Sequence, residues 1–523
     1  MTFNNFGKRT MAYIDKYGVE FSDDRKTLVK CPQDYQGYYE IPDGVRCIED
    51  FGFHDCSGLT GIIIPNSVTY IGGGAFSGCC SLLYVTIPDG VSDISPNTFS
   101  DCERLSAIKI PDGVVYIYHY AFAGCCSLTN IEIPHSVTFI GDSAFSDCFG
   151  LTSMVIPNSV TEIGEKAFLR CTNLTSIEIP NNVTCIGKEA FSNCYKLTSI
   201  EIPNSVTRIE EKTFFNCTNL TSVELPDNVI FIGNNAFSGC YNLTSIKIPD
   251  KVTSIVEGTF FHCSSLICVT IPNSVTNIGL YAFSDCYSLK SVRIPNGVTN
   301  IDNQAFRGCS GLTNIEIPDS VTSIGDEAFC GCSSLASIEL PNSVKSIGHS
   351  AFCRCSALTS ITISESITCI KKFAFTGCTS LTSITIPDSI TCIEMFAFSG
   401  CSSLTSIIIP DKVTTIEIEA FRNCTSLKHI KLPKGATNIC AKAFYDCSDL
   451  TSIEIPDSVI NIGEKAFYGC SNLTRVKMPS GITVIERYAF YGCSNLASIE
   501  IPNSVTSIEN KAFVGCKNLM SIE

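Results

Sequence analysis

The stretch from Leu174 to Lys196, LTSIEIPNNVTCIGKEAFSNCYK, repeats along almost the whole chain, and its next copy begins at Leu197. Cysteine recurs every 23 residues from Cys56 to Cys516, so the 460 residues between them make 20 steps and 21 copies without insertion or deletion. A fixed period of this length indicates a solenoid, in which each unit packs only on its neighbours. The sequence therefore predicts one elongated array instead of the three or four globular domains that 523 residues would otherwise suggest.

Each copy can be read as one coil with two short apolar segments. Residues 177–179, Ile-Glu-Ile, alternate as in a short strand that buries one face. The Pro180-Asn181 pair favours a turn, because proline presets φ and the Asn side chain can bond the backbone that follows it. A second apolar segment, residues 183–186, crosses the opposite side of the coil, and residues 190–194 close it.

Three columns of identical residues mark the predicted core. At all 21 positions the residue is the same, Phe from 53 to 513, Leu from 59 to 519 and Ile from 48 to 508. Identical side chains stacked in columns fill identical space, so a change in one coil would strain its neighbours. We expect the coils to stack at one strand spacing, about 4.8 Å.

The repeat resembles the BspA-like type of the leucine-rich repeat superfamily, whose 23-residue unit has the form LxxIxIPxxVxxIxxxAFxxCxx, from about Glu40 to Glu523. This resemblance implies a right-handed repeat solenoid with a parallel β-sheet on the concave face, short strands and turns on the convex face, and few helices. It also implies a non-catalytic protein-binding role, often as a surface or secreted adhesin that binds host, matrix or other cell-surface proteins.

The two ends of the chain depart from the repeat. Residues 1–37 are predicted to form an N-terminal cap of hairpin type, with strands at 19–21 and 27–30, and residues 38–523 to form about 21 coils. The sequence stops inside what would be the strand of another coil, without an atypical capping unit. We therefore expect self-association through the C-terminal end, because an uncapped coil exposes a strand edge.

Most of the 32 cysteines are interpreted as buried free thiols, because 21 of them share one repeated environment and point in parallel. Eleven lie outside this column. A four-thiolate zinc site is conceivable at Cys330, Cys332, Cys353 and Cys355, but two of these four belong to the column, and we predict no metal. Cys369 and Cys392 are in register on adjacent coils and could form a disulfide in an oxidising compartment.

The sequence indicates neither catalysis nor a cofactor. The six His residues lie far apart and share no column, whereas nucleophile and base must lie within hydrogen-bond reach. Phosphate-loop and dinucleotide fingerprints are missing. The balance of 36 basic and 51 acidic residues, −15 in all, disfavours nucleic acid as a partner, because phosphate binding needs a basic stripe.

The outward position of the first strand is the candidate binding surface, since variable outward side chains of a solenoid make an extended face. The candidate residues of this strip are Glu178, Glu201, Glu224, Lys247, Arg293, Glu316 and Glu339. One interpretation is an acidic docking strip for a basic protein segment or a cation, because stacked carboxylates repel one another. The other is a solvated polar face inherited by duplication.

Location is left open between two expectations. The resemblance implies the cell surface or secretion. However, no stretch approaches the roughly 20 apolar residues of a membrane helix, and the N-terminal residues have no apolar core of secretory type. The alternative is an intracellular protein–protein interaction scaffold without membrane insertion.

Overall fold

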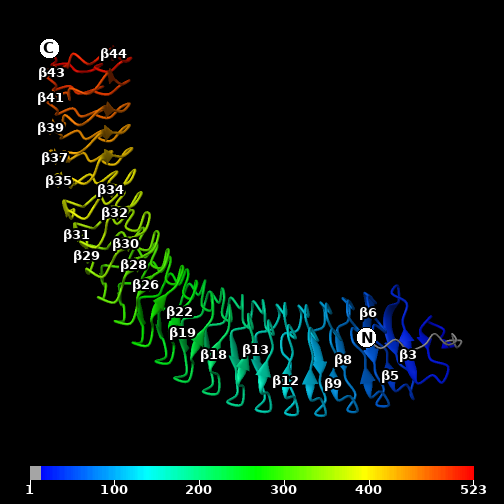
Figure 1. Cartoon of the computed structure of the whole chain (residues 1–523). Helices are drawn as coiled ribbons and strands as arrows, with labels where there is room; N and C mark the ends of the chain where they lie inside the picture. Colours follow the sequence, from blue (N-terminus) through cyan, green and yellow to red (C-terminus); the bar gives the residue numbers. More distant parts are fainter. Residues whose placement is uncertain (1–12, 523) are drawn as a thin grey trace, which may run out of the picture. The chain divides into compact units, whose positions relative to one another are not determined.

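Stacked parallel-stranded coils make up the structure. The computed structural model describes residues 13–522, and every regular element among them is a β-strand. Two compact units divide the chain, Met1–Val252 and Thr253–Glu523. In each unit the chain winds through 23-residue coils, with a first strand on one side and a second strand on the other, except that residues 130–132 of the first unit form no strand (Figure 1). The predicted solenoid of about 21 coils is confirmed, and residues 13–522 contain no helix.

Most first strands have three residues, of which the middle side chain is buried and its two neighbours are exposed, as in β15 and β17 below, which is expected for a short strand over an apolar core. Those of the first unit are β4 (Gln36–Glu40), β6 (Gly58–Ile63), β8 (Tyr84–Thr86), β10 (Ala107–Lys109), β13 (Ser153–Val155), β15 (Ser176–Glu178), β17 (Ser199–Glu201), β19 (Ser222–Glu224) and β21 (Ser245–Lys247). Those of the second unit are β23 (Cys268–Thr270), β25 (Ser291–Arg293), β27 (Asn314–Glu316), β29 (Ser337–Glu339), β31 (Ser360–Thr362), β33 (Ser383–Thr385), β35 (Ser406–Ile408), β37 (His429–Lys431), β39 (Ser452–Glu454), β41 (Arg475–Lys477), β43 (Ser498–Glu500) and β45 (Ser521–Ile522).

Second strands have two residues, and the second of these is the invariant Ile. Those of the first unit are β5 (Cys47–Ile48), β7 (Tyr70–Ile71), β9 (Asp93–Ile94), β11 (Tyr116–Ile117), β12 (Phe139–Ile140), β14 (Glu162–Ile163), β16 (Cys185–Ile186), β18 (Arg208–Ile209) and β20 (Phe231–Ile232). Those of the second unit are β22 (Ser254–Ile255), β24 (Asn277–Ile278), β26 (Asn300–Ile301), β28 (Ser323–Ile324), β30 (Ser346–Ile347), β32 (Cys369–Ile370), β34 (Cys392–Ile393), β36 (Thr415–Ile416), β38 (Asn438–Ile439), β40 (Asn461–Ile462), β42 (Val484–Ile485) and β44 (Ser507–Ile508).

Residues paired between neighbouring parallel strands are 23 positions apart in the sequence, the length of the repeat. In the parallel pair of β17 and β19, Ser199 faces Ser222 and Glu201 faces Glu224, 23 residues on. The same register continues through the turns, where the Phe214 backbone N–H donates to the carbonyl of Ala236 at 2.9 Å. Each sequence column is therefore a column in space within a unit.

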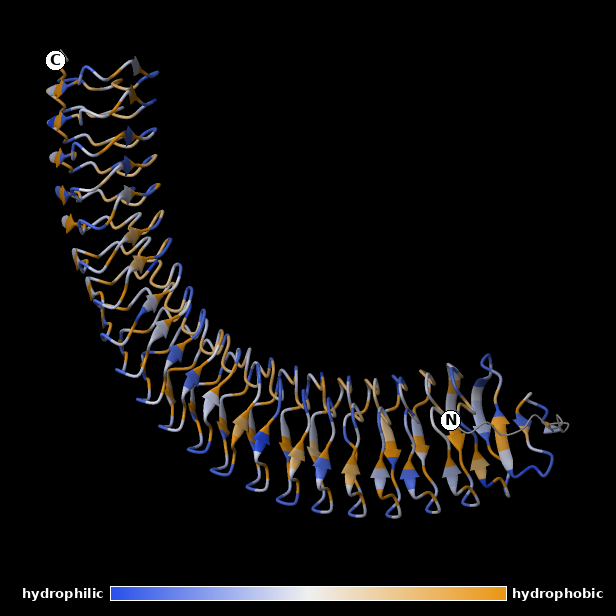
Figure 2. Ribbon diagram, in the orientation of Figure 1, coloured by the Kyte–Doolittle hydropathy of each residue, from blue (hydrophilic) through white to orange (hydrophobic). Residues whose placement is uncertain are grey.

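The Phe column forms the centre of the core. In the first unit its rings stack nearly parallel, as Phe191 and Phe214 do at 5.7 Å between centroids and 5° between planes. Both rings are fully buried. Figure 2 shows the resulting alternation of hydrophobic and hydrophilic residues along the coils. The apolar burial that holds a coil in place is thus supplied by the coils on either side of it.

The column cysteines are buried beside these rings, as predicted, with Cys516 in the last coil half-buried. They are more than apolar fillers, because the thiols donate hydrogen bonds across coils. The Cys217 Sγ lies 3.1 Å from the carbonyl oxygen of Phe191, and the Cys171 Sγ makes the equivalent contact with Phe145 at 3.1 Å. The same carbonyls also accept the backbone N–H of Cys194 and Cys148, so each thiol adds a second hydrogen bond to its carbonyl and is itself paired in the core.

The residue before every column cysteine has a left-handed backbone conformation. All 21 positions from Asp55 to Gly515 have positive φ, for example 56° at Asn216 and 75° at Gly239. Gly, Asn or Asp occupies 18 of them, since these residues adopt this conformation at the lowest cost. The turn after the Phe is therefore specified as strictly as the core.

Three strands precede the first coil. β1 (Tyr13–Ile14), β2 (Glu20–Phe21) and β3 (Thr27–Lys30) pair antiparallel in that order, and β3 then pairs parallel with β5. Part of the predicted cap, residues 1–12, lies outside the described residues. From β3 onward the antiparallel ladder passes into the parallel one of the coils.

Candidate functional site

Three carboxylates line up on the first-strand side of the first unit. Glu178, Glu201 and Glu224 are the last residues of β15, β17 and β19, and all three are exposed. They point outward because the preceding residue in each strand belongs to the core, as Ile200 does at 4% exposure. Among the ion pairs of residues 13–522, none involves these three carboxylates.

The carboxylates border two open hollows. One of about 380 Å³ lies below Glu201 and Glu224, and one of about 770 Å³ reaches back past Glu178 to His135. Three serines at the other outward position of the same strands, Ser176, Ser199 and Ser222, also line the larger hollow. Both hollows are open and combine carboxylates and amides, with hydroxyls in the larger one, with aliphatic and proline side chains, unlike the enclosed, mostly apolar small-molecule pockets.

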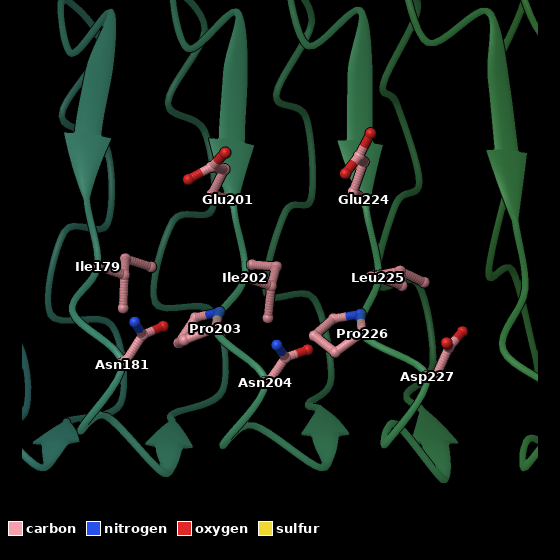
Figure 3. A pocket seen from close by; sticks show the side chains of 10 residues that line it. All are labelled: Ile179, Asn181, Glu201, Ile202, Pro203, Asn204, Glu224, Leu225, Pro226 and Asp227. Atoms are coloured by element: carbon pink, nitrogen blue, oxygen red, sulfur yellow. The ribbon is translucent and has the colours of Figure 1, made fainter.

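The hollow below Glu201 and Glu224 repeats from coil to coil (Figure 3). The figure shows the two carboxylates on consecutive strands, above a row of aliphatic side chains and a row of amide and carboxylate side chains. The aliphatic row is Ile179, Ile202 and Leu225, and the polar row is Asn181, Asn204 and Asp227. A ligand lying along the strip would meet the same chemistry at each coil.

Lys247 ends this series in the first unit. Its Nζ lies 3.4 Å from Oδ1 of Asp227, the acid of the polar row one coil earlier. Both side chains are well exposed, at 68% and 87%, so the pair contributes little to stability. The sequence predicted Lys247 as part of the strip. Its positive charge is opposite in sign to the carboxylates that precede it.

The remaining predicted residues lie in the second unit. Arg293 is directly opposite Glu316 in the parallel pair of β25 and β27. Glu316 and Glu339 line another open hollow, of about 730 Å³, together with Asp319. The seven predicted residues thus form an acidic group with Lys247 in the first unit and a smaller acidic group beside Arg293 in the second.

Two further surfaces of the second unit were not predicted. A hollow of about 850 Å³ has five basic residues and two acids among those lining it, His429, Lys431, Lys434, Arg475, Lys477, Glu454 and Asp457. In the closing turns, Tyr445, Tyr468 and Tyr491 stack at 4.6 and 4.8 Å between ring centroids. Lys431, Glu454 and Lys477 belong to the central outward column, where the sequence already shows them, whereas the tyrosines appear only when the other outward columns are compared at the 23-residue spacing.

No helix in the described part of the chain, residues 13–522, is long and apolar enough to span a bilayer.

The BspA type leucine rich repeat region matches the chain in seven overlapping segments between residues 36 and 523. The chain belongs to this family. The segments are 36–151, 94–221, 138–267, 184–313, 299–424, 345–457 and 437–523. No curated protein matches the chain.

Solved leucine-rich repeat proteins of bacteria are similar to the chain. A protein of Bacteroides ovatus is 25% identical, with 97% of this chain and 99% of that chain covered and a TM-score of 0.35. A leucine rich cell surface protein of Faecalibacterium prausnitzii is 30% identical, with 81% and 95% covered and a TM-score of 0.32. A leucine rich repeat protein of T. pallidum is 28% identical, with 43% and 87% covered and a TM-score of 0.28.

Proposed function

We propose that this protein is a non-catalytic protein-binding scaffold whose acidic strip, Glu178, Glu201 and Glu224, docks a basic segment of a partner protein. The observation that carries the proposal is the register of Glu201 against Glu224, without a cation paired to either among the described residues. Like charges directly across a ladder destabilise a sheet. A basic ligand would neutralise the two carboxylates. Part of its binding free energy would therefore come from removing the repulsion between them in the free protein.

The open shape of the hollows fits an extended chain. The rows of carboxylates, hydroxyls and amides continue over consecutive coils, which offers hydrogen-bond acceptors to lysine and arginine side chains along a line. Such a ligand gains affinity from electrostatic complementarity and loses it as salt rises.

The test uses the full chain and a labelled, unstructured Lys/Arg-rich peptide as the probe. Glu178→Gln, Glu201→Gln and Glu224→Gln together are expected to weaken binding at least tenfold and to flatten its salt dependence. The matched control replaces Glu162, Glu165 and Glu189, which lie on β14 or after second strands of the same unit, so that the net charge changes equally. Equal affinity of the two triple variants, or no binding at low salt, would contradict the proposal.

We further propose an adhesin-like or surface recognition role, with host, matrix or other cell-surface proteins as partners. The proposal rests on the resemblance of the repeat to the BspA-like group, whose members often have this role. The alternative is an intracellular interaction scaffold with the same docking surface. Surface protease treatment of intact cells, followed by fractionation, separates them. Loss of the protein on protease treatment supports the surface role, and complete protection supports the alternative.

A further inference from the structure

A cluster of metal-ligand side chains lies on second strands of the second unit, whereas the hollows above are lined from first strands. β32 and β34 pair in parallel, and their register sets Cys369 directly opposite Cys392. The neighbouring Ile370 and Ile393 are each 2% exposed, so alternation directs both thiols away from the core. Both cysteines are half-buried.

Glu394 brings a carboxylate to the two thiols. It follows Ile393, so it lies on the same outer side as Cys392, and its side chain bends back by one coil. Its Oε1 lies 3.6 Å from the Cys369 Sγ. The ligand atoms of Cys369, Cys392 and Glu394 all lie within 4.8 Å of one another.

We propose that Cys369, Cys392 and Glu394 bind a zinc ion. Zinc holds thiolate sulfur at about 2.3 Å and carboxylate oxygen at about 2.0–2.2 Å, so two ligand atoms of a tetrahedral zinc ion lie about 3.6–3.8 Å apart. The Cys369 Sγ and the Glu394 Oε1 already lie 3.6 Å apart, and side-chain rotations would bring the other ligand atoms of the cluster, all within 4.8 Å, to this separation. Two thiolates with one carboxylate select zinc over the hard cations Mg²⁺ and Ca²⁺, which take oxygen ligands alone.

His349 is the proposed fourth ligand and would reach the ion after a side-chain rotation, because among the described residues only Cys369, Cys392 and Glu394 have ligand atoms that all lie within 4.8 Å of one another. Its Nδ1 lies 3.7 Å from the Oε2 of Glu394, and its backbone N–H is fixed by a 2.7 Å hydrogen bond to Oδ1 of Asp326. Tetrahedral zinc with sulfur, nitrogen and oxygen ligands is common in proteins. The site would thus join three consecutive coils, since His349, Cys369 and Cys392 belong to three successive copies of the repeat.

The surroundings suit such a site electrostatically. The Lys371 Nζ lies 3.1 Å from Oε1 of Glu394, and the Lys372 backbone N–H donates to Oε2 at 2.9 Å. Two thiolates and one carboxylate carry three negative charges, which zinc and the Lys371 ammonium together balance. These partners also orient the carboxylate, as outer groups commonly do at metal sites.

The repeat does not require these two cysteines. The same column holds Ser346 before them and Thr415 after them, so the pair is not part of the core pattern. The zinc site considered from the sequence, at Cys330, Cys332, Cys353 and Cys355, is disfavoured by the structure. Cys332 and Cys355 are fully buried, and each donates to a Phe carbonyl at 3.2 Å.

The test measures zinc on the reduced full chain. Zinc content after dialysis, and competition against a chromophoric chelator, are expected to give one ion per chain. Co²⁺ in its place is expected to show the charge-transfer absorption of thiolate ligands. Cys369→Ser with Cys392→Ser should abolish both signals, and Glu394→Gln and His349→Ala should each lower the affinity at least tenfold.

The matched control is Cys330→Ser with Cys353→Ser, another half-buried pair of cysteines one coil apart. This variant should keep the zinc and the Co²⁺ spectrum, and far-UV circular dichroism checks that each variant folds. Three results would overturn the proposal: a zinc-free wild-type chain, full zinc content in Cys369→Ser with Cys392→Ser, or equal loss in the control. Unchanged affinity of His349→Ala would overturn the assignment of the fourth ligand.

Discussion

Glu201 lies directly opposite Glu224 in the parallel pair of β17 and β19, and both carboxylates are exposed. This arrangement opposes folding in the absence of a ligand, because like charges in register repel. It differs from Arg293 opposite Glu316 in the second unit, where the same strand position pairs opposite charges. The two units thus offer different electrostatic surfaces from the same repeat.

Neutralising one member of the acidic pair should stabilise the protein. We expect Glu201→Gln to raise the free energy of unfolding by about 0.2–1 kcal/mol at low salt, and the gain to shrink as salt screens the repulsion. Urea denaturation at two ionic strengths measures this. Glu162→Gln is the control, because Glu162 faces Phe139 and Cys185 and should show no gain. A loss of stability in Glu201→Gln would refute the prediction.

The Phe column should be far more sensitive than its chain neighbours. Phe214 is fully buried between two other rings, and Phe215 is half-buried. Phe214→Ala should lower the free energy of unfolding by about 3–5 kcal/mol, because the cavity is lined by stacked coils that cannot collapse. Phe215→Ala should cost less than half as much in the same urea titration. Similar losses for both would show that the stack is not the source of stability.

Alkaline pH should destabilise the fold through the column thiols. Burial raises the pKa of Cys217 to about 12, above the value of about 8.5 for an exposed thiol. As pH rises the unfolded chain therefore loses the proton first, so the stability due to burial is complete below about pH 8.5 and falls between about pH 8.5 and 12.

Removing one such thiol gives the matched measurement. Between pH 8 and 10, the free energy of unfolding of Cys217→Ala should fall by about 2 kcal/mol less than that of the wild type. Each buried thiol contributes about 1.4 kcal/mol per pH unit to this fall once the pH exceeds its unfolded-state pKa. The exposed Cys268→Ala should lose as much as the wild type does. Urea unfolding under reducing conditions at the two pH values decides between these outcomes. Parallel losses in all three proteins would contradict the assignment.

Acid should weaken one coil of the second unit through Glu419. Its side chain is 7% exposed and lies 3.0 Å from the Lys442 Nζ and 2.7 Å from the Arg422 guanidinium. Burial acts to raise the pKa of Glu419, but the hydrogen bonds from Lys442 and Arg422 outweigh it and hold that pKa below its ordinary value. The stabilisation is therefore present above the unfolded-state pKa, about 4.3, and is lost as pH falls through the lower folded-state pKa.

Glu419→Gln should remove this dependence and cost about 1–2 kcal/mol at pH 7, because the two cations remain part-exposed. Acid titration followed by circular dichroism compares it with the wild type. Glu327→Gln is the control, at the same repeat position but 37% exposed, with Arg307 at 3.0 Å. An equal effect of the two changes would argue against a role for burial.

We propose that residues 13–37, the described part of the predicted cap, cover the first coil, and Tyr39 tests the proposal. The Tyr39 hydroxyl donates to Oδ2 of Asp15 at 2.7 Å, and its ring is 1% exposed. Tyr39→Phe should lower the free energy of unfolding by about 1 kcal/mol, because Oδ2 of Asp15 loses the donor from Tyr39. Tyr38→Phe is the control, since Tyr38 is 45% exposed. Amide hydrogen exchange should show the loss in the first coils, and unchanged protection there would contradict the cap.

The amino-acid sequence by itself determined the repeat, the buried columns and the parallel register. Phe, Leu and Ile at a constant spacing of 23 can be buried together only if successive coils superpose, so the period dictates both the stacking and the pairing of Glu201 with Glu224. It also predicted which side chains point outward, because successive residues of a strand point to opposite faces and the neighbours of a buried residue are therefore exposed.

Tertiary structure alone decided what the outward side chains reach. The 23-residue spacing does not predict that the Glu394 side chain reaches back one coil to Cys369. It also does not predict that Lys247 pairs with Asp227 and not with the carboxylates of its own column. It also does not reveal that the column thiols donate to Phe carbonyls or that the residue before each is left-handed. These contacts depend on side-chain rotamers and backbone angles, which the packing of neighbouring coils selects and which a repeat pattern does not encode.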